Sequence, residues 1–180
     1  MELKRIIEGL IFAAESPLAE EKLVQLLPEH APEDVSAALR ALEGDFGTGR
    51  GIVLRRVAGG WQLRTAPELA PQVARVRNQT LKLSRAALET LASVAYRQPL
   101  TRAQIEDIRG VDCGNLLRAL VKRKLLKIAG RKEVPGRPPL YATTKTFLEV
   151  FDLDDLGHLP SLAEGESLAS PFTGTARPRA

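Results

Sequence analysis

Residues 83–147 read LSRAALETLASVAYRQPLTRAQIEDIRGVDCGNLLRALVKRKLLKIAGRKEVPGRPPLYATTKTF. Apolar residues recur at helical spacing in three successive segments of this stretch, and two short β-prone segments follow. Ser84 stands where a hydroxyl caps the first helix, and Thr101 and Gln104 have the spacing of a capping box at the start of the second. These local signals specify the helix boundaries more firmly here than elsewhere in the chain.

The end of this stretch has the pattern of a third helix and a hairpin. Asp112 is expected to cap the third helix. Segments 125–129 and 140–144 predict two strands, and Val134-Pro135-Gly136-Arg137 between them is typical of a type II turn. The prolines after the turn lack backbone donors, so the hairpin is expected at the edge of a sheet rather than in its centre. Three helices closed by such a hairpin predict a winged-helix module.

The first half of the chain repeats this pattern more weakly. Leu39-Arg40-Ala41-Leu42 recurs as Leu117-Arg118-Ala119-Leu120, and other apolar residues recur at offsets of about 80, as in two copies of one fold. The segments expected to form its helices and strands are 3–14, 19–27, 32–44, 52–57, 61–65 and 67–77. The fold class is therefore expected to be mainly α with small β-hairpin wings, as two tandem winged-helix domains.

The two copies set the expected domain boundaries. An N-terminal domain of residues 1–78 is followed by a C-terminal domain of residues 79–158, with a join near Asn78 to Thr80. Beyond that, Pro, Ser, Gly, Ala and Thr dominate and the apolar period disappears. Residues 159–180 are therefore expected to be a disordered tail.

Composition excludes several classes of protein. Apolar runs are all shorter than the roughly 20 residues that cross a bilayer, so we expect a cytoplasmic protein without membrane contact. Cys113 is the only cysteine, and His30 and His158 lie far apart in the sequence, so no metal site is expected. Motifs for a catalytic nucleophile or for phosphate binding are absent from the sequence. We therefore expect neither enzymatic activity nor a cofactor.

Positive charge is concentrated in the second copy. Residues 79–158 contain 14 Lys and Arg against 9 Asp and Glu, whereas residues 1–78 contain 10 against 11. A DNA-reading winged helix places its third helix in the major groove and contacts phosphates with basic residues. A solvated helix end or a protein-binding surface is the alternative use of such residues. The candidate DNA contacts on or just after the third helix are Arg118, Lys122, Arg123 and Lys124.

Three phrases in the second copy resemble a known family. Residues 95–101 read AYRQPLT, residues 108–111 read IRGV and residues 130–138 read GRKEVPGRP. Together they resemble segregation and condensation protein B, which implies two winged-helix domains in a non-enzymatic accessory subunit of the bacterial SMC–kleisin complex. The resemblance also implies dimerisation through the N-terminal domain and binding to the kleisin, segregation and condensation protein A. Through that kleisin the chain would join the SMC ATPase in chromosome condensation and segregation during cell division.

Candidate surfaces for these contacts follow from the pattern and the resemblance. One apolar helical stripe is expected to divide between the core and a dimer interface: Ile6, Ile7, Leu10 and Ile11. The expected kleisin-binding surface combines aromatic and wing residues: Tyr96, Arg131, Lys132, Pro135, Arg137 and Tyr141. DNA contact is expected to be weak or indirect, with the protein in the cytoplasm and associated with the nucleoid.

A dimeric winged-helix transcriptional regulator is the alternative function. Such a protein would read an operator with its second domain, binding one duplex sequence tightly and with a steep dependence on salt. A kleisin-binding subunit would bind DNA weakly and without sequence preference.

Overall fold

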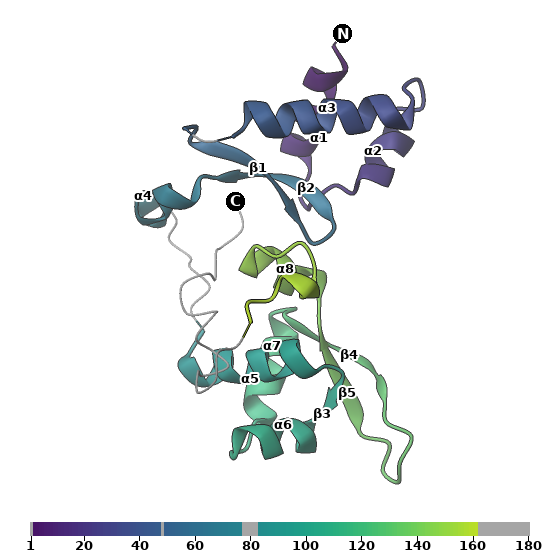
Figure 1. The fold of residues 1–180 in the computed structure, drawn as a ribbon. Helices are drawn as coiled ribbons and strands as arrows, with labels where there is room; N and C mark the ends of the chain where they lie inside the picture. Colours follow the sequence, from purple (N-terminus) through teal and green to yellow (C-terminus); the bar gives the residue numbers. More distant parts are fainter. Residues whose placement is uncertain (1, 48, 77–82, 162–180) are drawn as a thin grey trace. The chain divides into compact units, whose positions relative to one another are not determined.

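A computed structural model of the chain describes residues 2–47, 49–76 and 83–161 (Figure 1). The described residues fall into two compact units, one ending at residue 76 and the other starting at residue 83. The expected join near Asn78 lies outside the described residues, as does the expected tail from residue 162 on. Among the described residues, no helix is both long enough and apolar enough to cross a membrane.

The first unit consists of three helices, a hairpin and a short final helix. Its elements are α1 (Leu3–Ala13), α2 (Glu20–Leu26), α3 (Pro32–Asp45), β1 (Ile52–Val57), β2 (Gly60–Thr65), η1 (Pro67–Leu69) and α4 (Ala70–Val76). Pro32 occupies the first position of α3, where the fixed φ of proline fits a helix. The predicted end at Gly44 is one residue early, because Gly44 keeps a helical backbone and Phe46 forms the C-cap.

The hairpin of the first unit closes through a tight turn and contacts the segment before α2. Ala58 and Gly59 both have positive φ, at +53° and +75°, as a type I′ turn requires. Trp61 on β2 exchanges two backbone hydrogen bonds with Leu18, at 2.8 and 3.0 Å. Its side chain is buried among the residues of α1, α2 and α3, so this contact anchors the hairpin to the apolar core.

The second unit repeats the three helices and the hairpin, and adds a short strand and a covering helix. Its elements are α5 (Arg85–Arg97), β3 (Leu100–Thr101), α6 (Arg102–Arg109), α7 (Gly114–Lys122), β4 (Leu126–Arg131), β5 (Pro139–Thr143), α8 (Lys145–Phe151) and η2 (Leu156–His158). The predicted capping box is confirmed: Thr101 accepts from the Gln104 N–H, and Gln104 Oε1 accepts from the Thr101 N–H at 2.9 Å. Ser84 caps α5 as predicted, accepting the Ala87 N–H.

The start of α7 differs from the prediction. Its N-cap residue is Cys113, whose backbone N–H donates to Glu106 Oε1 at 2.9 Å. Asp112 lies one residue further out and accepts from the Gly114 N–H at 3.1 Å. Two carboxylates therefore accept the first amides of α7: Asp112, as expected, and Glu106 from α6.

The hairpin lies at one edge of its sheet, as expected, but the edge strand is β4 and the strand that returns from the wing, β5, is central. The sheet has the order β3-β5-β4, so Tyr141 on β5 pairs with Leu100 on one side and with Ile128 on the other. Pro139 is tolerated because it is the first residue of β5 and pairs with Arg131 beyond the end of β3. The hairpin strand with an unpaired outer side is therefore β4.

Helix α5 lies at the centre of the second unit's core. Eight of its 13 residues are buried. Helix α8 covers it with Phe147 and Phe151, whose ring centroids are 4.9 Å apart and which share one apolar cluster with Leu91. Thr144 starts α8 by accepting the Phe147 N–H at 3.1 Å, so a local cap positions the covering helix.

Candidate partner-binding surfaces

The apolar stripe of α1 divides into a buried part and a half-exposed part. Ile7 and Ile11 are buried in the core of their own unit and form the core part of the predicted stripe. Ile6 and Leu10 pack against that core with only part of their surface and remain half-buried. They lie side by side on one flank of the helix because residues four apart share a face.

This flank of α1 stays open because the end of the first unit does not cover it. The predicted helix 67–77 forms as η1 followed by α4, and neither element has a buried residue. Leu69 and Val73, the apolar residues of this segment four positions apart, are only half-buried. Lys4 on the same helix forms an ion pair with Asp45 of α3, with 2.7 Å between Lys4 Nζ and Asp45 Oδ2. That contact raises the pKa of Lys4 and lowers the pKa of Asp45.

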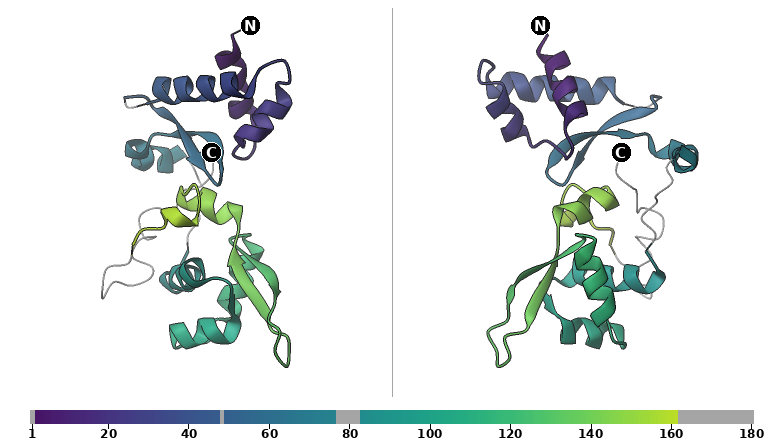
Figure 2. Two further views of the ribbon diagram at one scale, coloured as in Figure 1. Left: turned by 45° about the vertical axis from the view of Figure 1, so that its right-hand side comes forward. Right: turned by 180° about the vertical axis from the view of Figure 1, so that it is seen from behind.

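The wing of the second unit projects beyond the helices of its own unit in both views of Figure 2. The predicted turn is confirmed, since the Arg137 N–H donates to the Val134 carbonyl at 2.9 Å and Gly136 has a φ of +82°. Arg131 donates to the Arg137 carbonyl at 3.1 Å, which links the two sides of the wing. Lys132 and Pro135 are exposed.

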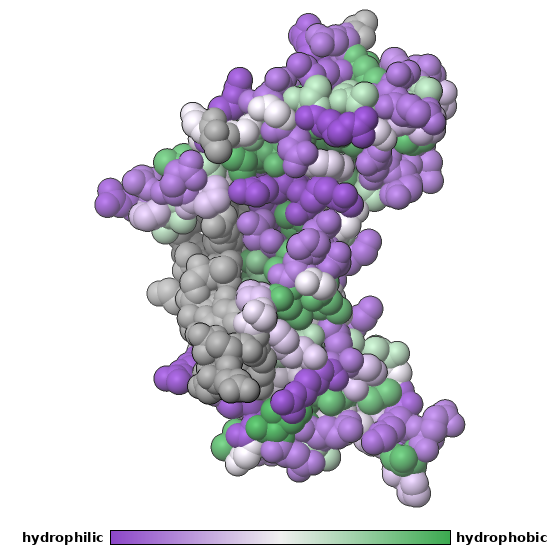
Figure 3. Space-filling view, in the orientation of Figure 1, coloured by the Kyte–Doolittle hydropathy of each residue, from purple (hydrophilic) through white to green (hydrophobic). Residues whose placement is uncertain are grey.

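The surface of the wing is largely hydrophilic, with a small hydrophobic area near its tip (Figure 3). Val134 there exposes 40% of its surface. Arg137 lies 3.7 Å from Glu133, an exposed pair that contributes little to stability. The wing therefore offers positive charge on a hairpin whose tip is held by its own backbone.

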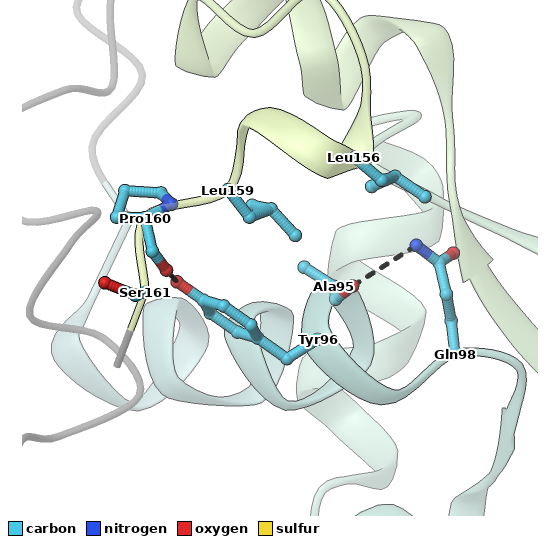
Figure 4. Close-up of a pocket in the computed structure, with 7 residues that line it drawn as sticks. All are labelled: Ala95, Tyr96, Gln98, Leu156, Leu159, Pro160 and Ser161. Carbon is cyan, nitrogen blue, oxygen red and sulfur yellow. Dashed lines mark hydrogen bonds between the residues drawn. The ribbon is translucent and has the colours of Figure 1, made fainter. Parts of the chain in front are cut away.

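The two tyrosines predicted for the kleisin surface have different surroundings. Tyr141 is half-buried in the centre of the sheet, beside Ile128. Tyr96, at the end of α5, donates its hydroxyl hydrogen bond to the Pro160 carbonyl at 2.7 Å, so the chain itself uses that hydroxyl (Figure 4). Figure 4 shows Tyr96 and Leu159 on opposite sides of a pocket of about 490 Å³. No sequence pattern marks Pro160 as the partner of Tyr96.

The basic residues around the end of α7 are exposed. Arg118 bonds the side chain of Asn115, one turn earlier on the same helix. Lys122 and Lys124 extend into solvent, and Lys124 has a φ of +58° where the chain turns from α7 into β4. Arg123 is also exposed. The four candidate DNA contacts therefore share one region of the second unit.

The turn between α6 and α7 is held by charged side chains. Arg102 binds Glu106, at 2.7 Å, and also Asp112. The Cys113 N–H and Arg102 both donate to Glu106, which lowers the pKa of that carboxyl below its usual 4.5, with the backbone contact as the larger cause. The hydrogen bond to Glu106 and the nearby charge of Asp112 raise the pKa of Arg102. This cluster fixes the angle at which α7 leaves α6, and so positions the basic end of α7.

Potential metal ligands do not gather in the part of the chain that the structure describes. Within residues 2–47, 49–76 and 83–161, no three His, Cys, Asp or Glu side chains lie close enough to hold an ion. His158 pairs with Asp155 at 3.0 Å, which lowers the pKa of Asp155. Both side chains are well exposed, and the pair belongs to the 3₁₀ turn η2.

Comparison with known proteins gives one consistent result. A family model described as segregation and condensation complex subunit ScpB matches residues 5–162. The chain is 49% identical over 168 residues to the segregation and condensation protein B of Myxococcus xanthus, covering 92% of this chain and 51% of that protein. It is 48% identical over 166 residues to the protein of the same name from Syntrophotalea carbinolica, covering 91% and 84%. The chain thus spans about half the length of the Myxococcus relative.

Solved structures with similar sequences have related names. ScpB from Mycobacterium tuberculosis is 37% identical, with 82% of this chain and 93% of that chain covered and a TM-score of 0.39. A dimer of an ScpB N-terminal domain complexed with ScpA peptide is 30% identical, with 41% of this chain and 93% of that chain covered and a TM-score of 0.38.

Proposed function

Because the chain belongs to the family of the segregation and condensation complex subunit ScpB, we propose that it forms a dimer and binds the kleisin subunit of a bacterial SMC complex. The match over residues 5–162 carries this proposal. In that role the chain performs no reaction of its own. It attaches to segregation and condensation protein A, which connects it to the SMC ATPase at the nucleoid in the cytoplasm.

The first domain, residues 1–78, is proposed to form the dimer. The open flank of α1 supports this role, because Ile6 and Leu10 are only half-buried there and the last helix of the described first unit, α4, has no buried residue. A second copy of the same helix would bury both side chains from water. Ile7 and Ile11 would act only by supporting α1 from within the core.

The second domain, residues 79–158, is proposed to bind the kleisin through its wing. Support comes from the net charge of this half of the chain and from the projection of the hairpin. Lys132, Pro135 and Arg137 are exposed near the tip, where a partner could reach them. Contact with DNA would be weak or indirect in this arrangement.

Co-expression with segregation and condensation protein A from the same genome tests the proposal. Size-exclusion chromatography with mass detection should show the isolated chain at twice its 19.6 kDa, and a larger species that contains both proteins. A chain that stays monomeric and elutes apart from that protein would contradict the proposal. Tight binding of one duplex sequence, persisting with competitor DNA, would support a transcriptional regulator instead.

Substitutions on α1 test the dimer surface separately. Ile6→Asp together with Leu10→Asp should convert the dimer to a monomer, since carboxylates would be placed in an apolar contact. Phe12→Asp is the matched control, because Phe12 lies on the other side of α1 and exposes 76% of its surface. Dimer loss in the control as well would remove the Ile6–Leu10 flank from this role.

Charge reversal on the wing tests the kleisin surface. Arg131→Glu together with Arg137→Glu should weaken co-purification with the kleisin at least about tenfold. Lys22→Glu together with Arg40→Glu changes the net charge equally at exposed positions of the first unit and is the control. Unchanged kleisin binding in the wing variant would exclude the wing from the contact.

A further inference from the structure

The open edge of β4 adjoins a groove that no sequence pattern marks. The groove lies between the end of α7, the start of β4 and the start of α8, and has a volume of about 510 Å³. Strand β4 pairs with β5 on one side and with no other strand of the described residues. The backbone N–H and C=O groups along its outer side are therefore available to a further strand.

The floor of this groove is apolar. Val121 is half-buried at the end of α7, and Leu126 is buried where β4 begins. Ile128, two residues along the same strand, exposes 58% of its surface. Covering Ile128 with an apolar side chain would remove this area from water and stabilise a complex.

The rim of the groove is positively charged. Lys124, Lys127 and Lys145 reach it from the α7–β4 turn, from β4 and from α8, and all three are exposed. None of them has an ion-pair partner among the described residues, and none of the described residues that line the groove is acidic. The three ammonium groups thus form a positive rim around an apolar floor.

The walls of the groove are held in place by Thr144. Its hydroxyl donates to the Lys124 carbonyl and also accepts the Phe147 N–H at 3.1 Å. One side chain therefore ties the α7–β4 turn to the start of α8. The rim is set before a partner arrives, so binding loses less conformational freedom than it would on a loose loop.

We propose that this groove binds an extended acidic segment of the kleisin, which adds to the sheet as a strand beside β4. Alternate side chains of such a strand point to opposite faces, so carboxylates would meet the lysines while apolar residues cover Ile128. The inference rests on the proposed function for the partner's identity and adds the chemistry of the bound segment. Duplex DNA fits less well, because phosphates use neither an apolar floor nor a sheet edge.

Two charge reversals test the groove without disturbing the fold. Lys127→Glu changes an exposed strand residue, and Lys145→Glu places an acidic side chain at the first residue of α8, where it is favourable. The double variant should bind purified segregation and condensation protein A about 30-fold more weakly than the wild type, with dimerisation unchanged. Ile128→Thr, which keeps a β-branched residue, should weaken binding about fivefold. Lys22→Glu with Arg40→Glu is again the control for net charge.

Hydrogen exchange in the full chain supplies a second measurement. Amides of residues 127–131 should exchange at least about tenfold more slowly when the kleisin is bound, because new strand pairing protects them. If the wild-type chain binds no kleisin, this inference and the proposed function both fail. If the kleisin binds but the groove variants have no effect and these amides stay unprotected, the groove inference alone fails. If the double variant loses only its retention of a 20-base-pair duplex, the groove is a nucleic-acid site and the inference is wrong.

Discussion

Helices α1 and α5 occupy the same place in the two units, yet their burial differs greatly. Helix α1 buries only Ile7 and Ile11, whereas α5 buries eight residues around most of its circumference. The element after the hairpin accounts for the difference. In the second unit Phe147 and Phe151 of α8 belong to the same apolar cluster as the buried residues of α5, while α4 in the first unit has no buried residue.

This comparison explains how a duplicated fold can acquire two functions. The second unit, whose first helix α5 is largely buried, needs no further surface to cover that helix. Its wing and its groove are therefore free to bind partners. The other unit leaves an apolar flank that is more stable when another surface covers it. We therefore expect partner contacts to form at different elements in each unit.

Removing the covering helix's main side chain should have the largest effect. Phe147→Ala empties a fully buried position and should lower the free energy of unfolding of the second unit by about 3–5 kcal/mol. Circular dichroism should detect the loss. Fluorescence of Trp61, the only tryptophan, reports on the first unit and should keep its midpoint.

Phe12→Ala is the control for that loss, since Phe12 is largely exposed and its removal should cost less than about 0.5 kcal/mol. An equal shift of the Trp61 transition in Phe147→Ala would show that the two cores unfold as one. The contrast between a covered and an uncovered helix would then carry no independent meaning.

Matched leucines on α1 and α5 sharpen the comparison. Leu91→Ala should lower the free energy of unfolding by about 3 kcal/mol, because Leu91 is 1% exposed. Leu10→Ala should lower it by about 1 kcal/mol in the monomer, because Leu10 is half-buried. If α1 forms the dimer, the cost of Leu10→Ala should grow with protein concentration. Denaturation at two concentrations measures this, and a concentration-dependent cost for Leu91→Ala instead would reverse the assignment.

Local signals were sufficient to predict most of the second unit. Ser84, Thr101 and Gln104 cap helices with groups close to them in sequence, and Gly110 ends α6 with a φ of +68°. Such contacts depend on neighbours within four residues, so sequence spacing reveals them. In the first unit the start of α3 was found from Pro32, which occupies the first helical position.

Contacts between distant segments were not predictable in this way. Strand β3 has two residues and exists because β5 lies beside it, and the hydroxyl of Tyr96 meets Pro160 from 64 positions away. The groove beside β4 combines three such segments. No periodicity marks a site whose parts are brought together only by folding.

The caps of α6 and α2 provide a smaller test of the same comparison. Thr101→Ala should lower the free energy of unfolding of the second unit by about 1 kcal/mol, because it removes the cap of α6. The matching position in the first unit is Ala19, which makes no side-chain cap. Ala19→Thr with Lys22→Gln should therefore stabilise the first unit by about 0.5–1 kcal/mol, seen as a later Trp61 transition. No gain there would show that the start of α2 is already fixed by the Leu18–Trp61 bridge.

The smallest effect concerns pH and the turn between α6 and α7. Hydrogen bonds from the Cys113 N–H and from Arg102 lower the pKa of Glu106 below 4.5 in the folded chain. A carboxyl with a lowered folded pKa stabilises the fold fully above its unfolded pKa, and that stability is lost as pH falls through the folded value. The stability difference between wild type and Glu106→Gln should therefore be constant near neutral pH and shrink below about pH 4.5. Ala19 in the first unit matches Thr101, so Val24 matches Glu106. The first unit therefore has no titrating carboxyl at this position.

Nuclear magnetic resonance checks this directly, because the Cys113 amide is bonded to the titrating carboxyl. Its chemical shift in the wild-type chain should follow a titration with a midpoint below 4.5, and the transition should be absent in Glu106→Gln. Asp107→Asn, the same change of charge at the exposed neighbouring residue, should leave the Cys113 titration in place. A midpoint at or above 4.5 would mean that Glu106 does not hold the turn in solution. The angle between α6 and α7, and with it the position of the basic end of α7, would then depend on packing alone.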